Sequence, residues 1–465
     1  MTTNTSGYPR RQPQLSPQET RLWNWAQNAT LAEKSQQVRP ASEKELQALL
    51  QHCRGQVRLT GSKMSPGRML SVSKREDLLI DMSALRGFIS SDEHSATFAA
   101  GTQLNEVYRV LNEMGRILPA SPGVIDEQTL AGALATGTHG QGLGQSSIGD
   151  EALSFRMVLA DGSVRTFDRQ HPWFHAVQVS LGCLGVITEV TLRTRPAEVY
   201  TCFKHAVSAD TLENDLLKWN RDAALSKAWW FPGEDQVHLW SAHVATDAER
   251  ARYRDNQHEL VVQEQTSDAM NQTIDQTLKE MHSDTQITDK NGKPFRTVTR
   301  FKDFSDVTGN VYQVFCRGIA TPQINVEIAI PLARVGAVIK RIKRWHQLTQ
   351  PHMHYPVILR CTGASESWLS PSWQQESCFF GFVVYYAEDG TLSAEGVDFL
   401  RQIEKMLAEE GGRPHWGKYF DASLYQWQAL YPKWQEFCAV REALDPQHKL
   451  SNAFSERLLN GGAER

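Results

Sequence analysis

The chain has 465 residues, of which 40% are hydrophobic and 22% are charged, a composition typical of a globular protein. Because this length exceeds one ordinary hydrophobic core, we expect two domains. The formal net charge of -4 gives no electrostatic basis for binding a nucleic acid, and the absence of an apolar run of about 18 residues argues against a membrane span.

Cysteine use and the polar first residues predict where the protein works. The seven cysteines include no C-x-x-C pair and lie mostly in apolar contexts, which favours reduced, buried thiols. Residues 1–20 are polar, lack the apolar stretch of a secretory signal and are expected to form a flexible tail. We therefore expect a cytoplasmic protein.

From about residue 38 onward, helices and strands are mixed. Ser42 is a suitable N-cap and Glu45 follows three residues later, as in a capping box, so a helix is predicted to begin near Pro40. Further on, the apolar spacing and the turn residues predict strands at 57–60, 78–82 and 96–100, a helix at 103–114, a hairpin of 153–159 and 163–167, a helix at 174–181 and a strand at 186–194.

A boundary between domains is predicted near Pro196. Beyond it, the pattern predicts strands near 228–231, 237–240, 311–316, 325–330, 357–361 and 378–386, helices at 248–281, 332–348 and 394–410, and an exposed loop at 284–294. Antiparallel strands with helices on one face would give an α+β second domain.

Glycine is concentrated between residues 132 and 142. This run contains Gly132, Gly137, Gly140 and Gly142, two threonines and His139, with almost no bulky side chain. Glycine lets backbone N–H groups approach a ligand closely and adopt positive φ angles. The run is therefore interpreted as a cradle for a phosphate-bearing or ring-containing cofactor.

Several short motifs, taken together, resemble the FAD-linked oxidase superfamily typified by vanillyl-alcohol oxidase, and most closely its aldonolactone and alditol oxidase branch, which includes D-arabinono-1,4-lactone oxidase. The motifs that carry the resemblance are Trp23-Asn-Trp25, Val38-Arg-Pro40, the Gly61 loop, Ala100-Gly-Thr-Gln-Leu104, residues 129–142 and 180–188, Trp368-Leu-Ser-Pro371, His415-Trp-Gly-Lys418 and Leu444-Asp-Pro446. The resemblance covers nearly the whole chain. It implies an α+β fold with an FAD-binding domain of the PCMH type at 21–197, a substrate (cap) domain with an antiparallel sheet at 198–410, and a C-terminal segment at 411–465 that returns to the flavin.

The resemblance also implies which residues hold FAD. By this likeness the pyrophosphate is bordered by Gly61, Ser62, Lys63, Met64, Ser65, Pro122 and Gly123; the ribityl chain and ring by Thr129, Gly132, Ala135, Gly137, Thr138, His139 and Gly140; and the remaining parts by Ser147, Gly185, Val186 and Ile187. Backbone amides and the Lys63 side chain would face the phosphates.

Lys418 is the family residue expected beside the N1–C2 edge of the flavin. Hydride arriving at flavin N5 places negative charge at that edge, and a fixed ammonium group stabilises it, most strongly in a dry pocket. The resemblance therefore implies a catalytic role for Lys418.

One departure from the family pattern concerns the cofactor. Family members carry a histidine in the first loop that bonds to the flavin 8α-methyl group, whereas this chain has Met64 at the aligned position. A thioether does not form that linkage, so we expect non-covalent FAD. His139 lies in a separate element and is not expected to replace the missing histidine.

A second departure concerns the substrate. Of the family's Glu-x-Arg pair, Arg360 remains, to activate the reacting oxygen, but Ile358 stands in place of the glutamate, and Gly381 and Val383 replace polar residues of the next strand. An unpaired buried polar group costs about 1–3 kcal/mol, so a simple polyol is not expected. The aromatic residues beside these positions are Phe379, Phe380, Phe382, Tyr385 and Tyr386, which would suit a less polar substrate.

The catalytic base stays open at this point. His415, Tyr355, Tyr385 and water are candidates, and His415 is also placed in the substrate pocket with Ile358, Arg360, Gly381 and Val383. Glu327 is assigned a structural position. No metal is expected, because the His352-x-His354 pair has no third ligand at a suitable spacing.

We thus expect an FAD-dependent oxidoreductase that transfers a hydride from a CH–OH or similar C–H centre of a small molecule to flavin N5. Two alternatives remain: a flavin-dependent C=C reductase or dehydrogenase of an apolar natural product, and a non-catalytic flavin-binding protein. The sequence does not choose between O2 and another electron acceptor, and it does not give the oligomeric state.

Overall fold

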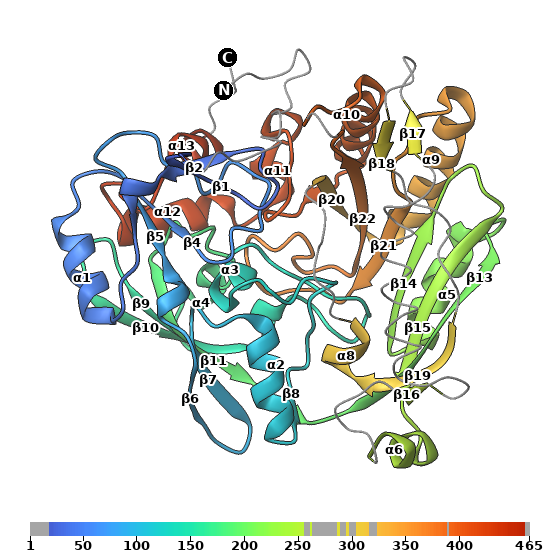
Figure 1. The fold of residues 1–465 in the computed structure, drawn as a ribbon, viewed down its shortest axis with the longest axis horizontal. Helices are drawn as coiled ribbons and strands as arrows, with labels where there is room; N and C mark the ends of the chain where they lie inside the picture. Colours follow the sequence, from blue (N-terminus) through green and yellow to red (C-terminus); the bar gives the residue numbers. More distant parts are fainter. Residues whose placement is uncertain are drawn as a thin grey trace.

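A computed structural model describes residues 18–254, 261–262, 286–288, 294–296, 304–315, 323–387 and 390–460. Of the expected tail at 1–20, all but the last three residues lie outside this part of the chain. The helix expected at 248–281 is described only in its first part, as α6 (Asp247–Arg254). Figure 1 shows the arrangement of the elements, with the N-terminal half to the left and a large sheet to the right.

The first half of the chain contains two main sheets. A three-stranded sheet has the order β3-β5-β4 and is parallel, and a five-stranded sheet has the order β10-β9-β11-β7-β6 and is antiparallel. Their strands are β3 (Gln37–Val38), β4 (Val57–Thr60), β5 (Leu78–Asp81), β6 (Phe88–Ser91), β7 (Ser95–Ala99), β9 (Ala152–Val158), β10 (Val164–Asp168) and β11 (Val186–Arg193). Two small antiparallel pairs are β1 (Arg21–Trp23) with β2 (Thr30–Glu33), and β8 (Arg116–Ile117) with β12 (Arg195–Pro196).

Capping residues and glycine set the ends of helices in this half of the chain. Ser42 accepts a hydrogen bond from the Glu45 N–H at the start of α1, as a capping residue does. Gly115, with a φ of +68°, follows the end of α2. The helices are α1 (Glu43–His52), α2 (Leu104–Glu113), α3 (Leu130–Ala135) and α4 (Phe174–Val177), with single 3-10 turns η1 (Lys34–Gln36), η2 (Met82–Ala84) and η3 (Ile148–Glu151).

A nine-stranded sheet dominates the second half, in the order β16-β19-β13-β15-β14-β21-β22-β20-β23. Its strands are β13 (Val199–Ser208), β14 (Leu225–Trp230), β15 (Gln236–Val244), β16 (Val261–Val262), β19 (Phe304–Asn310), β20 (Gln323–Pro331), β21 (Val357–Thr362), β22 (Ser377–Tyr385) and β23 (Arg413–Pro414). Every pair in this sheet is antiparallel.

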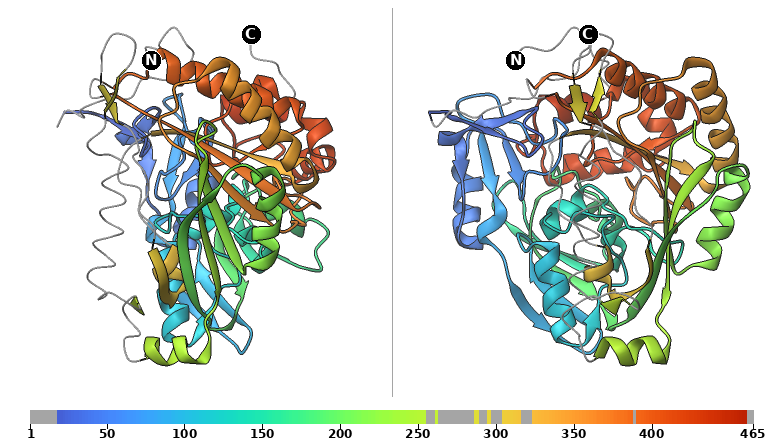
Figure 2. Two further views of the ribbon diagram at one scale, coloured as in Figure 1. Left: turned by 90° about the vertical axis from the view of Figure 1, so that its right-hand side faces the viewer. Right: turned by 45° about the vertical axis from the view of Figure 1, so that its right-hand side comes forward.

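Alternation of side chains divides the large sheet into two faces with different tasks. One face is apolar and packs on α5 (Leu212–Asp222), α9 (Val335–Thr349, preceded by the 3-10 turn η4, Leu332–Arg334) and α10 (Ala394–Glu409). Figures 1 and 2 show these helices on the outer side of the sheet. The opposite face is turned toward the N-terminal half of the molecule. An α+β fold with an antiparallel sheet in the second half, as expected, is confirmed.

The C-terminal segment returns to the N-terminal half. The Val57 N–H donates to the Lys449 carbonyl, and Arg58 donates to the Leu450 carbonyl. The segment contains a stack of aromatic rings, with Trp416 and Trp427 centroids 5.2 Å apart. Its helices are α11 (Trp427–Leu430), α12 (Trp434–Leu444) and α13 (Ala453–Leu459), with the 3-10 turn η5 (Ala422–Leu424). The domain boundaries expected from the sequence stay a prediction.

The strand expected at 311–316 is wrong over its described part. Residues Val311–Phe315 form the short helix α8, and the strand β19 ends just before it. The reason is polar capping: Asn310 Oδ1 accepts from the Gln313 N–H, and Gln313 Oε1 accepts from the Asn310 N–H, both at 2.9 Å. Val311 and Val314, three positions apart, are then both buried on one helical face.

Two further expectations need correction. The loop expected at 284–294 contains the strand β17 (Gln286–Thr288), which pairs with β18 (Pro294–Arg296). The helix expected at 174–181 ends at Val177, and Leu181 and Gly182 take φ angles of +55° and +66°, which a helix does not tolerate.

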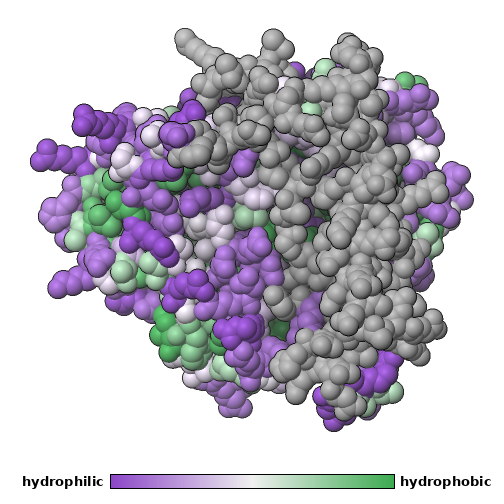
Figure 3. Space-filling view, viewed as in Figure 1, coloured by the Kyte–Doolittle hydropathy of each residue, from purple (hydrophilic) through white to green (hydrophobic). Residues whose placement is uncertain are grey.

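The coloured part of the surface in Figure 3 is mostly hydrophilic, with a hydrophobic patch over the β6–β7 hairpin. Phe88 and Ile89 on β6 are exposed there. Among the described residues, no helix has the length and apolar character needed to cross a membrane.

Candidate active site

A cavity of about 390 Å³ lies between the loops of the N-terminal half and the inner face of the large sheet. One wall is built from loops that are rich in glycine, together with the segment His415–Lys418. The other wall is built from side chains of β13, β14, β15, β20, β21 and β22. A site between two layers of this kind is the usual place for a cofactor and its substrate.

Most of the residues that the sequence placed around the cofactor and substrate line this one cavity. They are Gly61, Ser62, Lys63, Met64, Ser65, Gly123, Thr129, Gly132, Ala135, Thr138, His139, Gly185, Val186, Ile187, Ile358, Arg360, Gly381, Val383, His415 and Lys418. The sequence separates them by up to 357 positions, yet the fold brings them together.

Four of the expected residues do not line the cavity. Pro122 is buried, and Gly137 takes a φ of +71° beside Pro371 and Val179. Gly140 is pressed against Ser121, where a Cβ would lie 2.6 Å from the Ser121 carbonyl oxygen. Ser147 donates to Asp150 at the start of η3. These four residues therefore support the loops of the wall and do not themselves face the cavity.

Backbone in the loop wall approaches its neighbours too closely for side chains. A Cβ at Gly61 would lie 2.1 Å from Thr129 Oγ1, and a Cβ at Gly123 would overlap the Arg360 guanidinium. Lys63 has a φ of +59°, and its Nζ lies 3.7 Å from Asp81 Oδ2. The wall therefore offers backbone and small side chains to a ligand, which fits a cofactor with phosphates and a flat ring.

Register across the large sheet sets the second wall. Residues directly opposite in antiparallel strands share a face. Ile358 lies opposite Gly381, and Gly381 lies opposite Glu327 on its other side. Two positions away in the same direction, Arg360 lies opposite Phe379. Glu327 therefore stands in the same row as Ile358, with only the glycine between them.

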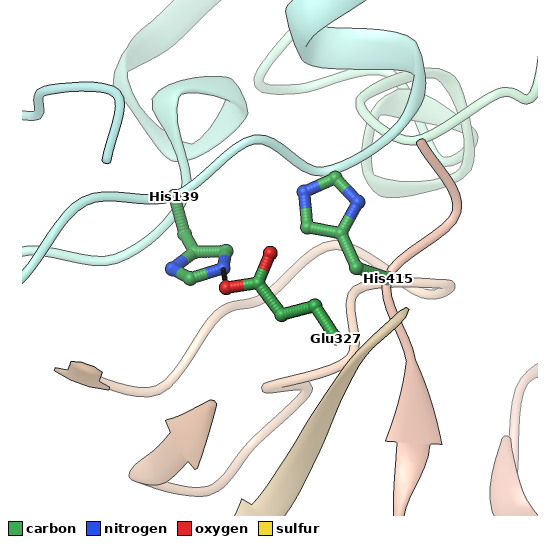
Figure 4. Close-up of side chains that lie close together, drawn as sticks. All are labelled: His139, Glu327 and His415. Atoms are coloured by element: carbon green, nitrogen blue, oxygen red, sulfur yellow. Dashed lines mark ion pairs between the residues drawn. The ribbon is translucent and has the colours of Figure 1, made fainter. Parts of the chain in front are cut away.

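Glu327 is the centre of a buried polar cluster. Its Oε1 atom forms an ion pair with Arg360 and lies 3.4 Å from His139 Nε2. His139 Nδ1 lies 3.1 Å from the Gly140 carbonyl, and the ring stacks on Phe379 with centroids 3.5 Å apart. Figure 4 shows the second carboxylate oxygen of Glu327 pointing into the space between the two imidazoles.

His415 has a fixed tautomer in this arrangement. Its Nδ1 accepts a hydrogen bond from the Gly417 N–H at 2.9 Å, so in the neutral ring the proton is on Nε2. Burial holds the pKa of His415 well below its usual range, which keeps the ring neutral. His415 is thus a hydrogen-bond donor, and its candidacy as a base loses support.

Electrostatics in the cluster favour an ionised carboxylate. Burial by itself would raise the pKa of Glu327, but the adjacent Arg360 guanidinium outweighs it, so the pKa lies well below the ordinary value. Burial lowers the pKa of His139, and burial also lowers the pKa of the half-buried Lys418, against the attraction of Glu327. Strongly perturbed groups gathered in one cavity are typical of an active site.

Sequence reasoning missed the main acidic residue. Glu327 was given a structural position, whereas it is the acidic member of the cavity wall among the described residues. A signal was present, because Gln323, Asn325 and Glu327 alternate with apolar residues and so share the inner face of β20. Other missed wall residues are Lys204, Lys227, Trp229 and Trp240.

Only some of the expected aromatic residues face the cavity. Tyr385 lines it and Phe379 stacks on His139. Phe380, Phe382 and Tyr386 belong to the apolar core beneath the helices, with Phe382 against Phe399 of α10 at a centroid distance of 5.9 Å, although Phe382 also borders the cavity. Tyr385 also belongs to an apolar cluster in the cavity wall, together with Tyr355, Val383, Trp229 and Ile358.

His352 and His354, the two histidines considered as metal ligands, differ in burial, because His352 is partly exposed. His354 is fully buried: Nδ1 accepts from the Tyr385 N–H, Nε2 lies 3.3 Å from Ser393 Oγ, and burial lowers its pKa to about 3. Among the described residues, His139, Glu327 and His415 form the one group whose donor atoms lie within 4.8 Å of one another. The Glu327 carboxylate is already paired with the Arg360 guanidinium. This pairing favours a hydrogen-bonded network over a metal site at these three residues.

Comparison with known proteins connects this cavity with two families. The model of D-arabinono-1,4-lactone oxidase matches residues 190–458, and an FAD binding domain model matches residues 35–168. The chain is 27% identical to L-gulono-1,4-lactone dehydrogenase of Mycobacterium tuberculosis, over 94% of this chain and 99% of that protein. It is 25% identical to alditol oxidase of a Streptomyces species, over 95% of this chain and 100% of that one.

Solved structures show the same fold in more distant proteins. Cholesterol oxidase from Brevibacterium sterolicum, as its His121Ala mutant, superimposes with a TM-score of 0.71 at 15% identity, over 97% of this chain and 100% of that one. A solvent-stable cholesterol oxidase gives a TM-score of 0.69 at 17% identity, over 95% and 97%.

Proposed function

The chain belongs to the D-arabinono-1,4-lactone oxidase family and is an FAD-dependent oxidoreductase acting on CH–OH donors, and from this premise we propose that it holds FAD non-covalently and uses Glu327 as the catalytic base. The family agrees with the main expectation from the sequence. It does not favour a C=C reductase or a non-catalytic binder.

The loop wall fits the cofactor. Gly61 leaves no room for a Cβ, and a Cβ at Gly123 would displace the Arg360 guanidinium. The loop from Gly61 to Ser65 lines the cavity and presents amides next to Lys63. These residues would hold the diphosphate, and residues 129–140 with Lys418 would hold the flavin. When bound, FAD supplies the hydride acceptor.

Non-covalent attachment rests on two residues. Met64 lines the cavity, and by the resemblance of the first loop it stands where family members carry the linking histidine. His139 is held between the Gly140 carbonyl, Phe379 and Glu327. Because the ring is engaged with these partners, we do not assign His139 to a covalent link with the flavin. The test is to unfold the yellow holoprotein in acid or denaturant and pass it through a filter. We expect all flavin in the filtrate; flavin that stays on the polypeptide would refute this proposal.

Glu327 is placed to accept the proton of the substrate hydroxyl. It is ionised, its Oε1 is held by Arg360, and its other oxygen points into the space between His139 and His415 (Figure 4). His139 Nε2 at 3.4 Å can share the proton once the carboxyl has taken it. The position of Glu327 in the cavity wall supports its assignment as the base, because a base must lie within hydrogen-bond reach of the proton that it removes.

Arg360 and His415 would act on the substrate oxygen. Arg360 reaches over Gly123 at the cavity wall, and its guanidinium carries fixed positive charge. His415 can donate its Nε2–H, because Nδ1 is engaged with the Gly417 N–H. Two donors at an oxygen that gains negative charge lower the barrier without moving in the reaction. Lys418 would carry out the same task at the N1–C2 edge of the cofactor.

Anaerobic mixing of the holoprotein with alcohols and lactones tests the reaction itself. We expect bleaching of the flavin absorption by a CH–OH compound, with a ketone, aldehyde or lactone as the product. If no such compound reduces the flavin, while a dithionite-reduced sample passes its electrons to an activated C=C bond, the proposed reaction is wrong.

A further inference from the structure

The sheet wall of the cavity is apolar close to the proposed base. One row of directly opposite residues runs from β14 through β21 and β22 to β20 and consists of Trp229, Ile358, Gly381 and Glu327. All four line the cavity. A single glycine therefore separates the carboxylate from an isoleucine, and the next residue of the row is a tryptophan.

Three more side chains extend this apolar surface. Tyr355, Val383 and Tyr385 form one packed cluster with Trp229 and Ile358, and the two tyrosine rings meet edge to face with centroids 6.3 Å apart. Tyr355, Val383 and Tyr385 are 6%, 5% and 1% exposed, whereas Ile358 and Trp229 are only partly buried. Ile358 and Trp229 therefore keep carbon surface that the described part of the protein does not cover.

Register directs the apolar surface away from the guanidinium of Arg360. Ile358 lies opposite Gly381, and Arg360, two positions along β21, lies opposite Phe379. Val383 stands on β22 two positions from Gly381 in the other direction. A substrate whose hydroxyl meets the guanidinium can therefore lay its remaining carbon atoms on the apolar surface.

Polar side chains are gathered on the neighbouring strand, β20. Asn325 lies opposite Val383, and Gln323 lies opposite Tyr385. Both line the cavity and share the inner face of the strand with Glu327. This part of the wall thus has a polar edge on β20 and an apolar surface on β21 and β22.

Two ammonium groups border the apolar surface at Trp229. The Nζ atoms of Lys204 and Lys227 each lie 5.2 Å from the centre of the Trp229 ring. An aromatic ring attracts a cation at such a distance. These groups are thus engaged at the ring, and the surface that a ligand can cover is centred on Ile358 and Val383.

Gly381 leaves room for a ligand beside the isoleucine. The three atoms nearest to a Cβ built on this glycine all belong to Ile358, at distances of 3.4 to 3.8 Å. These are ordinary van der Waals distances, so a methyl-sized group fits there in contact with Ile358. A carbon atom of a ligand can therefore lie next to the strand that carries Glu327.

Such a surface favours hydrocarbon over hydroxyl groups. A hydroxyl placed on Ile358 or Val383 would lose its water without gaining a hydrogen bond, which disfavours binding. A hydrocarbon group in the same place removes apolar surface from water on both partners, which favours binding. Uncovered apolar surface that is gathered in one place is typical of a ligand-binding site.

We propose that Ile358 and Val383, with the rings beside them, bind a hydrocarbon group of the substrate whose hydroxyl is oxidised at Glu327 and Arg360. This inference deepens the proposed function and rests on it. It names the substrate class as alcohols with an alkyl or aryl body, in contrast to polyols and sugar lactones, in which every carbon carries oxygen.

Pairs of compounds with the same carbon chain test this preference. Hexane-1,2-diol has the chain of sorbitol, pentane-1,2-diol has the chain of xylitol, and each pair shares the same diol end. For each compound, kcat/KM is measured from anaerobic flavin reduction by the holoenzyme. We expect each diol to exceed its polyol by about tenfold or more, as one methylene group in an apolar pocket can provide. Equal values, or higher values for the polyols, would overturn the inference.

Substitutions at Ile358 test where the preference arises. Ile358→Thr adds a hydroxyl to the apolar surface and should lower the preference for diols at least about fivefold. Ile358→Val keeps a hydrocarbon side chain and should keep the preference within about threefold. Leu348→Thr makes the same apolar-to-polar change at a side chain that is 75% exposed on α9, and it should leave the preference unchanged.

Damage to the fold gives a different result from loss of the apolar surface, because damage lowers kcat/KM for both members of a pair alike. Should Ile358→Thr lose FAD, Val383→Thr, which has nearly the shape of the original side chain, takes its place with the same expected effect. A preference that survives in both threonine variants would contradict the inference.

Hexan-2-one separates this inference from the proposed oxidation, because it has the hydrocarbon group but no CH–OH centre. Its binding to the holoenzyme is followed through the flavin absorption spectrum. Binding that is at least about fivefold weaker in Ile358→Thr supports the apolar site even if no diol reduces the flavin, in which case the proposed oxidation fails instead. Reduction by polyols and diols at equal rates means that the oxidation stands and the inference fails.

Discussion

The two walls of the cavity are built by different means. In the loop wall the backbone is the contact surface, and residues close in sequence, such as Gly61 to Ser65, are close in space. In the sheet wall the side chains are the contact surface, and Glu327 and Arg360 meet only through the pairing of strands that are far apart in sequence. At Gly61 the first wall leaves no room for an added atom, whereas the second wall presents side chains whose chemistry can differ.

The strongest way to test this contrast is to add atoms to the loop wall. Gly61→Val places a Cβ 2.1 Å from Thr129 Oγ1 and within 2.8 Å of Thr129 Cβ, which rotation of the threonine does not relieve. We expect purified protein without FAD, measured as lost absorption near 450 nm and at least about 100-fold weaker binding in fluorescence titration, equivalent to about 2.7 kcal/mol. Gly144→Ala, in open space, is the matched control and should keep FAD.

Changing the charge on the sheet wall should spare the cofactor and stop the chemistry. Glu327→Gln keeps the shape of the side chain but removes the base, so we expect kcat to fall about 10³-fold with FAD still bound. Stopped-flow reduction of the flavin under nitrogen measures this. Glu366→Gln, at an exposed carboxylate, is the control. Reduction within threefold of the wild-type rate in Glu327→Gln would exclude the carboxylate as base.

Lys418 belongs to the His415–Lys418 segment of the loop wall, and the pH dependence of the reaction should reveal its role. Burial lowers its pKa below 10.5, so as pH rises the ammonium group is lost sooner than from a free lysine. The rate of flavin reduction should therefore decline on the alkaline side below pH 10.5. Lys418→Arg stays charged and should move the decline upward, and Lys418→Met should be about 100-fold slower at neutral pH. An unchanged alkaline limb in Lys418→Arg would assign the decline to another group.

The smallest expected effect concerns charge in the loop wall. Lys63 is paired with Asp81 at 3.7 Å and is 27% exposed, so water and the carboxylate weaken its contribution to phosphate binding. Lys63→Met should weaken FAD binding about three- to tenfold, with the rate of flavin reduction at saturating FAD unchanged. A loss as large as that of Gly61→Val would mean that charge, not backbone shape, governs this wall.

The same contrast explains how much of the molecule the sequence predicts. The helix at Leu104–Glu113 and the Gly61 loop follow from spacing and turn residues within a dozen positions. The replacement of the family's glutamate by Ile358 stays a prediction from the aligned motifs. The place of Glu327 in the same row is not evident from the sequence, because it stands opposite Gly381 on the other side of β22, and only the register of three strands places it there. The strand predicted at 311–316 is wrong for a different reason. Capping by Asn310 starts the helix α8 at Val311–Phe315, although the apolar run there resembles a strand.

The pleat of the large sheet has an evolutionary consequence. Trp229 and Glu327 alternate along their strands with Ala228, Trp230, Val326 and Ile328, which hold the helices in place. Because neighbouring side chains point to opposite faces, a mutation on the inner face leaves the core beneath the helices intact. Lineages that share this scaffold can thus exchange one recognition residue at a time, retaining foldability and FAD while the preferred alcohol changes.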